Sequence, residues 1–400
     1  MDGFHWRCSE CGSVRSRDEG QSPCPDCLRG WEPGRPIRGI LLGEFPWEEI
    51  RSRLDPRAPD LDLLRADEPA WRPPYPMPET PLFPAPRLAR ELDLPGLLVK
   101  HDGLLMSGSL KDRASCAVVS EALRIGQTTV VAASTGNAGS SLAAVCAAAG
   151  LKAVLYLPAS APKAKLLQAR IHGAELHPVD GTYDDAFRLS LEHTRTRGGL
   201  NRNTAWHPMT IEGKKTVALE IFRQMGWRIP DWVVVPTGDG VILSGVYKGF
   251  LDLVRVGLAR RLPRILAVQA RASDAVHRHF RTGSYSDADS PATVADSISV
   301  RTPAAAFLAV RALRESAGES VVVSDEEILD AQAWLARSAG VFGEPASAAG
   351  LAGLRTFRNR LRGDERVVLL VTGHGLKDVE APLGWMDRAG GTGGRMDGWR

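Results

Sequence analysis

The chain has 400 residues, a formal net charge of +3 and 44% hydrophobic residues. This length is sufficient for two or three packed units. The nearly balanced charge argues against a nucleic-acid partner, and no segment is apolar for long enough to span a bilayer. The first residues also lack the basic and apolar stretches of a secretion signal. We therefore expect a soluble, cytoplasmic protein with no nucleic-acid and no membrane partner.

Four of the six cysteines form two Cys-x-x-Cys pairs near the N-terminus, Cys8 with Cys11 and Cys24 with Cys27. Two such pairs supply the four thiolates of a closed tetrahedral zinc site. A bound metal can hold together a segment that is too short to form a core. The spacing therefore predicts a structural zinc ribbon over residues 1–32. The alternative is a set of surface thiols without metal.

Residues 33–95 are rich in proline and charge, which predicts an extended arm lying over the main body. From Leu97 onward, runs of Val, Ile and Leu alternate with helical segments, which predicts an α/β fold with parallel sheets covered on both faces. In chain order, we predict strands at 97–100, 128–134, 152–158, 174–179, 231–238, 264–270 and 367–373, and helices at 109–126, 135–150, 162–173, 182–198 and 210–226.

Ligands of such folds bind at the carboxyl ends of the strands. Three predicted strands end in loops of small and polar residues, at 134–139, 237–240 and 372–375. We expect these loops to border the site. The predicted division of the chain is a large domain of residues 96–112 and 206–384, a small domain of residues 113–205 and a flexible tail of residues 385–400.

Lys111 follows the turn Ser107-Gly108-Ser109-Leu110 and opens a predicted helix. Burial and the positive end of the helix dipole both favour the neutral amine, which can form a Schiff base with an aldehyde. The pattern therefore fits a lysine that holds a cofactor such as pyridoxal phosphate (PLP) through this bond. A solvent-facing lysine on an amphipathic helix is the alternative.

Each strand-end loop has a functional and a purely structural interpretation. Backbone N–H groups of the 237–240 loop can bind a phosphate monoester, or the loop can be a plain turn. It holds only part of the dinucleotide fingerprint, which argues against a nicotinamide-dependent oxidoreductase. The 134–139 turn could hold a carboxylate and a phenolic oxygen, or only cap a helix. Thr372 could lie opposite a pyridine nitrogen, while His374 could equally be a structural histidine.

Taken together, these motifs resemble the threonine synthase family of fold type II PLP enzymes. The resemblance covers residues 8–378, nearly the whole chain, and several members of the family carry an N-terminal zinc ribbon. It implies a two-domain α/β fold with open, mostly parallel twisted sheets, in which residues 96–112 and 206–384 form the PLP-binding domain. The matching segments are SGSLKDR (107–113), ASTGNAG (133–139), EGKKTVALE (212–220), GEPASAA (343–349) and TGHGLKD (372–378).

The resemblance also implies roles for individual residues. Lys111 carries the cofactor as an imine and then moves protons at the alpha and beta carbons of the substrate. Asn137 bonds the ring oxygen of the cofactor, Thr372 faces its pyridine nitrogen, and its phosphate is held by Gly238, Asp239, Gly240 and Val241. The predicted substrate-binding residues are Ser134, Thr135, Gly136, Ala138, Trp206, His207 and Thr210.

The chain departs from the family where O-phosphohomoserine would place its phosphate. The family has Thr, Asn, Ser and Arg at the positions that are here Ala138, Thr204, Ala205 and Thr210. An Arg clamp on phosphate is a strong interaction, so its loss weakens this subsite. Asp239 stands where the family usually has Asn, and its carboxylate would repel a phosphate unless it turned away to cap the next helix. Charge could come from Lys163, Lys165, Lys214 or Lys215.

Trp206 and His207 occupy the same wall, which favours a smaller, neutral or differently shaped pocket, with core packing as the alternative for Trp206. We predict a PLP-dependent lyase of the threonine synthase type, whose family default is the conversion of O-phosphohomoserine to threonine. The close alternative is beta-elimination or beta-replacement on serine, threonine or an O-activated derivative. A zinc-ribbon binding protein with an inactive enzyme-like body is a third hypothesis. The expected partner is a small amino-acid substrate, and the expected assembly is a homo-oligomer, a dimer.

Overall fold

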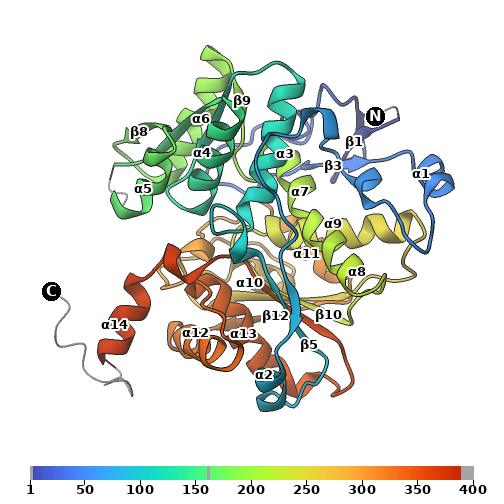
Figure 1. Ribbon diagram of the computed structural model, residues 1–400. Helices are drawn as coiled ribbons and strands as arrows, with labels where there is room; N and C mark the ends of the chain where they lie inside the picture. The colour runs from blue at the N-terminus through green and yellow to red at the C-terminus, as the bar shows by residue number, and fades with distance from the viewer. Residues whose placement is uncertain (1–2, 160–162, 389–400) are drawn as a thin grey trace.

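The computed structural model describes residues 3–159 and 163–388, and Figure 1 shows its ribbon. These residues form a six-stranded sheet, a four-stranded sheet and a three-stranded sheet. The first two sheets are parallel apart from one edge strand, as the alternation of strands and helices predicted. The expected α/β class is therefore confirmed.

The six-stranded sheet has the order β12-β11-β10-β13-β5-β4, in which only β4 runs antiparallel to its neighbour. Val233 and Val235 pack on one face and Val234 on the other, because successive side chains of a strand alternate. The strands are β4 (Leu82–Pro84), β5 (Leu97–His101), β10 (Trp232–Pro236), β11 (Arg264–Ala270), β12 (Glu319–Val323) and β13 (Val367–Val371).

Helices cover both faces of this sheet (Figure 1). One face is covered by α9 (Val241–Arg255), α10 (Ala275–Thr282) and α11 (Ala306–Glu315), with α8 (Thr216–Gln224) packed on α9. The other face is covered by α2 (Pro86–Glu91), α12 (Asp325–Ala339) and α13 (Pro345–Phe357). Since β10, β13 and β5 are neighbours, the loops that follow them emerge side by side at one edge.

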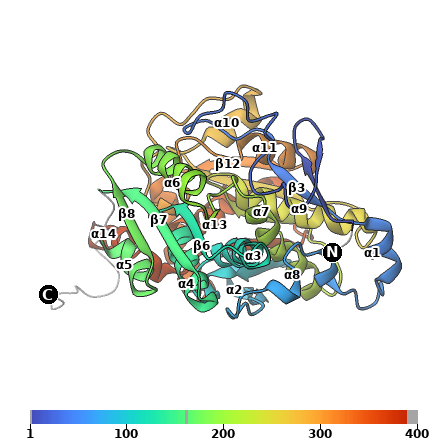
Figure 2. The same cartoon turned by 90° about the horizontal axis from the view of Figure 1, so that it is seen from above.

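The four-stranded sheet has the order β8-β7-β6-β9 and lies within the predicted small domain. In Figure 2, α6 lies on one side of its strands and α4 and α5 on the other. Two further helices, α3 (Lys111–Arg124) and α7 (Met209–Lys214), pack against each other. The remaining elements of this region are β6 (Thr129–Ala133), α4 (Asn137–Ala149), β7 (Lys152–Pro158), α5 (Lys163–Ile171), β8 (Glu175–Val179), α6 (Tyr183–Arg197) and β9 (Leu200–Asn201).

The N-terminal sheet joins the predicted ribbon to the predicted arm. Its strands β1 (His5–Cys8) and β2 (Val14–Arg15) pair with each other, and β3 (Leu41–Glu44), which lies beyond residue 32, pairs with β1. The arm is less extended than predicted. It contains α1 (Trp47–Arg53), α2 and two 3-10 turns, Leu61–Leu64 and Pro69–Trp71. Buried apolar side chains, such as Ile50 in α1 and Leu88 in α2, anchor the two helices and the first turn, whereas the second turn has no buried residue.

The described C-terminal part ends in α14 (Glu380–Arg388), so residues 385–388 of the predicted flexible tail are helical. Residues 389–400 of that tail lie outside the described residues. Further 3-10 turns are found at Asp102–Leu104, Asp296–Ile298, Arg358–Arg360 and Gly375–Lys377. Within the described ranges, every helix is too short or too polar to cross a lipid bilayer.

Candidate active site

Lys111 is the first residue of α3, and its neighbours in the chain fix the start of that helix. The carboxylate of Asp112 accepts hydrogen bonds from the backbone N–H of Ser107 (2.8 Å) and the hydroxyl of Tyr75 (3.0 Å). Arg113 is fully buried and donates to Asp102 at 2.7 Å. These side chains are held within the protein, whereas Lys111 is half-buried and borders a cavity.

The cavity has a volume of about 520 Å³. This volume is within the range of small-molecule sites, roughly 300–1,000 Å³. Lys111 faces it together with the predicted substrate and cofactor residues Ser134, Thr135, Gly136, Asn137, Ala138 and Asp239. The first turn of α6 and residues from two loops, 31–37 and 291–304, complete the wall. The structure therefore brings the lysine and the 134–138 turn into one site.

The 134–138 turn connects β6 to α4. The hydroxyl oxygen of Ser134 accepts a hydrogen bond from the backbone N–H of Gly139 at 2.9 Å, so Ser134 stabilises the turn. The side-chain amide of Asn137 donates to Glu344 at 2.9 Å and to the hydroxyl of Ser297 at 3.1 Å. Asn137 thus links the start of α4 to the 3-10 turn Asp296–Ile298 and to the residue before α13, beside the cavity.

The loop after β10 is constrained by close packing. A Cβ atom at Gly238 would lie 2.8 Å from the Cα of Ile298, and Gly240 has a φ of +82°, which L-residues with side chains rarely adopt. Asp239 accepts a hydrogen bond from the N–H of Val241, the first residue of α9, at 2.9 Å. The carboxylate therefore turns toward the helix start, and Asp239 is the member of this loop that borders the cavity.

Thr372 follows β13 and lies next to the start of α3. Its carbonyl oxygen accepts from the N–H of Leu110 at 2.8 Å, and its hydroxyl lies 3.2 Å from that of Ser347. Thr372 is buried and does not contribute to the cavity wall. It is nevertheless close to Lys111, because it is hydrogen-bonded to Leu110, the residue that precedes Lys111 in the chain.

Three predicted substrate residues lie behind the wall. His207 is fully buried, and its ring bonds the side chain of Gln21 (3.0 Å) and the backbone N–H of Met209 (3.2 Å). Thr210 donates its hydroxyl hydrogen to the carbonyl oxygen of His207 at 2.7 Å. Trp206 packs on Trp31 with ring centroids 5.4 Å apart, so it supports a side chain that borders the cavity.

The sequence analysis missed two contributions to the site. Glu344 is buried beside Asn137, and its burial raises the pKa of the carboxyl despite the hydrogen bond from Asn137 and the charge of Lys111. The only sequence signal for it was the GEPASAA match, to which we gave no role. The segment 31–37 borders the cavity and is anchored by a hydrogen bond from the N–H of Ile37 to the carbonyl of Ala304 (2.9 Å). Nothing in its sequence pointed to that position.

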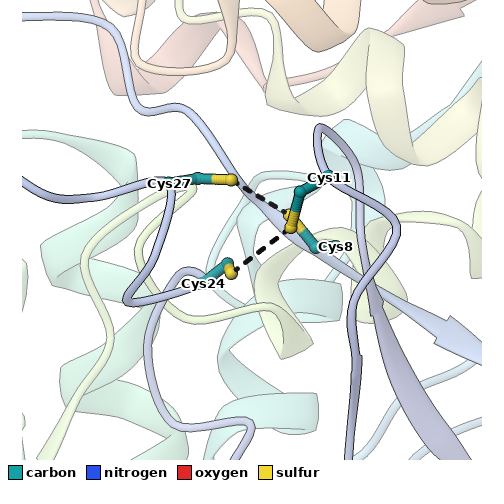
Figure 3. Close-up of side chains that lie close together, drawn as sticks. All are labelled: Cys8, Cys11, Cys24 and Cys27. Carbon is teal, nitrogen blue, oxygen red and sulfur yellow. Dashed lines mark hydrogen bonds between the residues drawn. The ribbon is translucent and has the colours of Figure 1, made fainter.

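The four N-terminal cysteines lie together, as Figure 3 shows. The Sγ atoms of Cys8 and Cys27 are 3.7 Å apart, those of Cys11 and Cys24 are 3.9 Å apart, and all four lie within 4.8 Å of one another. Sulfur atoms around a tetrahedral zinc ion with bonds of about 2.3 Å are about 3.8 Å apart. The cluster has the size that such an ion requires.

A half-buried lysine at a helix start, among polar turns at the ends of parallel strands, is the arrangement that α/β enzymes use to hold PLP. We assign the chain to that class. Residues 75–373 match the family model described as "Pyridoxal-phosphate dependent enzyme". The chain is 36% identical to the threonine synthase of Methanosarcina acetivorans over 95% of this chain and 94% of the relative, and 38% identical to that of Synechocystis over 76% and 78%.

The chain therefore belongs to the PLP-dependent enzymes and, among them, to the threonine synthase family. Solved structures agree on the fold: maize serine racemase superposes with a TM-score of 0.66 at 22% identity, covering 78% of this chain and 92% of the other. A threonine deaminase from T.th. gives 0.64 at 26% identity, covering 74% and 92%. The chain is a PLP-dependent enzyme of the lyase type, which performs elimination or replacement on an amino acid.

Proposed function

We propose that the chain uses Lys111 to bind PLP and converts O-phosphohomoserine and one water molecule to threonine and inorganic phosphate. The observation that carries this proposal is the shared cavity of Lys111 and the 134–138 turn. It puts an amine that can join the cofactor beside hydroxyl and backbone groups that can hold an amino-acid carboxylate. The threonine synthases that this chain resembles over nearly its whole length support the choice of substrate.

The residues around the cavity suit PLP. Lys111 would bind the cofactor covalently, Asn137 would form a hydrogen bond with its ring oxygen, and Thr372 would face its pyridine nitrogen. The loop of residues 238–241 would hold the phosphate, and the buried amine of Lys214 nearby, which has no hydrogen-bond partner among the described residues, would suit an anionic group. When bound, the cofactor supplies an electron sink for the substrate's carbon atoms.

The protein's own residues bind, orient and move protons. The amine of Lys111, once free, would take the proton from the alpha carbon and return it at a neighbouring carbon. Ser134, Thr135 and the N-terminal turn of α4 would hold the carboxylate and so fix which hydrogen faces Lys111. Trp31 and the 33–37 segment would cover the cavity and limit the access of water.

A direct test compares wild type, Lys111→Ala and the control Lys152→Ala, whose lysine is exposed on β7. We expect wild type and control to be yellow and to release phosphate and threonine from O-phosphohomoserine. Lys111→Ala should lose the lysine-bound chromophore and at least about a thousandfold in kcat, because it lacks both the attachment point and the base. Full activity of Lys111→Ala would overturn the proposal.

Beta-elimination or beta-replacement on serine, threonine or an O-activated derivative is the second candidate. It is favoured by Ala138 in the cavity wall and by Thr210, whose hydroxyl is occupied by His207. Incubation of the enzyme with serine or threonine and detection of keto acid and ammonia distinguish the two candidates. Faster turnover of these amino acids than of O-phosphohomoserine would replace our first choice.

We also propose that the four cysteines bind one structural zinc ion. The sulfur-to-sulfur distances support tetrahedral coordination, and Cys8 and Cys24 are buried, so the ion would be part of the N-terminal core. Metal analysis of the purified protein should give one zinc per chain, and Cys24→Ser should reduce this value. A protein that contains no metal and keeps the same melting temperature with a chelator would contradict the assignment.

A further inference from the structure

Two buried basic side chains near the cavity have no counter-ion within hydrogen-bonding distance among the residues that the structure describes. Lys214 is the last residue of α7, has no exposed surface, and its Nζ finds no hydrogen-bond partner among the described residues. Arg202 is 1% exposed and donates from Nη1 to the hydroxyl of Thr204 at 3.1 Å, while its Nε and Nη2 are without partners in the described part of the chain. Burying a charge without a partner is strongly unfavourable, so such groups indicate a missing anion.

The neighbouring Lys215 is a buried lysine of the same core that does form ion pairs. It is as deeply buried as Lys214, but its Nζ donates to Asp252 at 2.9 Å and also contacts Glu212 at 2.5 Å. Despite burial, these two carboxylates raise its pKa. Lys214 therefore differs from its neighbour in pairing and not in burial, so its missing partner is a specific feature.

Both cations lie beside the cavity. Thr204, which holds Arg202, borders the cavity, and so does Asp239. Lys214 lies where α7 packs closely on α9, because a Cβ atom at Gly245 would be only 2.7 Å from the Cβ of Lys214. Helical side chains lean toward the N-terminus of their helix, which directs Lys214 back over the face it shares with Thr210, four residues earlier.

The electrostatics show that these groups share one environment. Burial lowers the pKa of Lys214 well below its usual range, and the charge of Lys111 lowers it further, while Asp239 opposes this. Burial alone would raise the pKa of the Asp239 carboxyl, yet Lys214, Lys111 and Arg202 bring it below its ordinary value. Three cations therefore act on a single carboxylate, which is itself partly occupied by the N–H of Val241.

We propose that Arg202 and Lys214 form an anion site at this wall, which binds the dianion of a phosphate monoester. The proposal rests on the proposed function and adds the chemical class of the group that this wall recognises. Two phosphate monoesters could enter the cavity, the cofactor and a phosphorylated amino-acid substrate, and their phosphate groups have the same chemistry. A dianion would supply the negatively charged partner that both side chains lack. Arg202 would bind it through several N–H donors of its guanidinium group, and Lys214 through its compact ammonium group.

The test uses Lys214→Met and Arg202→Met, which keep apolar volume in place of the cations, with Lys152→Met on the surface as the matched control. The first measurement is the melting temperature of the cofactor-free variants. Lys214→Met should melt at or above the wild-type temperature, because it replaces a buried polar amine that has no hydrogen-bond partner among the described residues by an apolar side chain. A structural role for Lys214 predicts a lower melting temperature instead.

The second measurement identifies the phosphate. In one arm, PLP and its phosphate-free analogue pyridoxal are titrated into cofactor-free protein and followed by absorbance. In the other arm, inorganic phosphate is titrated into the holoenzyme and followed by calorimetry. If the cofactor's phosphate is the occupant, both variants weaken PLP binding at least tenfold and leave pyridoxal unchanged. If the substrate's phosphate is the occupant, PLP binding is unchanged and inorganic phosphate binds at least tenfold more weakly.

Proton uptake provides an independent readout. A neutral Lys214 in the cofactor-free protein should take up a proton when a dianion binds, so wild type should show an uptake that Lys214→Met lacks, measured by calorimetry in buffers of different ionisation enthalpy. Unchanged affinities in both arms would overturn the anion site, although the Lys111 chromophore would still support the proposed function. If the wild type does not bind PLP, the proposed function is contradicted. If the same protein still binds inorganic phosphate, the anion site is supported independently of that function.

Discussion

His207 should make the folding stability of this protein depend on pH in the acidic range. Its burial lowers the pKa of the imidazole to about 4, against a smaller opposing effect of Glu121. The ring accepts from the N–H of Met209 through Nδ1, so Nε2 carries the hydrogen that is donated to Gln21. Histidine in an unfolded chain has a pKa of about 6.5, so the unfolded state binds the proton first as the pH falls.

The stabilisation from the neutral ring is therefore complete above about pH 6.5 and is lost as the pH falls toward 4. One pKa unit corresponds to about 1.4 kcal/mol, so the shift to about 4 is worth about 3 kcal/mol, most of which is lost by about pH 4.5. His207→Gln keeps a donor for Gln21 but does not titrate. We expect the variant to lose about 1–2 kcal/mol near neutral pH and to show a correspondingly flatter dependence on pH.

The assay is urea unfolding of wild type, His207→Gln and the exposed control His172→Gln at several values between about pH 7 and about pH 4.5. The control should follow the wild type throughout. Because the His207 ring lies behind the cavity wall, KM and kcat of the His207 variant should stay within about threefold of wild type. An unchanged pH dependence would refute the reasoning from burial, and a large rise in KM would support substrate contact instead.

Two further predictions concern packing. Gly213→Ala should lower the free energy of unfolding by about 1–3 kcal/mol, since the new Cβ would lie 2.2 Å from the carbonyl oxygen of Arg113. The control Gly363→Ala, whose new Cβ would have nothing within 4 Å, should leave the free energy of unfolding unchanged, and thermal melts of the two variants test the difference. Trp31→Ala should raise the KM for the amino-acid substrate about fivefold with a smaller change in kcat, because Trp31 borders the cavity and packs on Trp206; steady-state kinetics in which kcat alone fell would contradict this role.

The elements with strong local signals were predicted well. The strands at 128–134 and 231–238 correspond to β6 and β10, and Lys111 begins α3 as its turn motif indicated. The sequence analysis predicted no strand at 319–323, where β12 forms the sheet edge, and treated the arm as extended although it holds α1 and α2. Short segments of this kind acquire their structure from the surfaces against which they pack, and their own residues carry little periodicity.

The sequence by itself determined the chemistry that is encoded in local spacing: the lysine at a helix start, the small polar turns after the strands, and the paired cysteines. Only the tertiary structure decided that Lys214 has no partner within the described ranges while Lys215 has two carboxylates, and that His207 faces Gln21 behind the cavity wall. It also decided that Trp31 borders the cavity. The physical reason is that burial and charge pairing depend on side chains from distant segments, which only packing brings together.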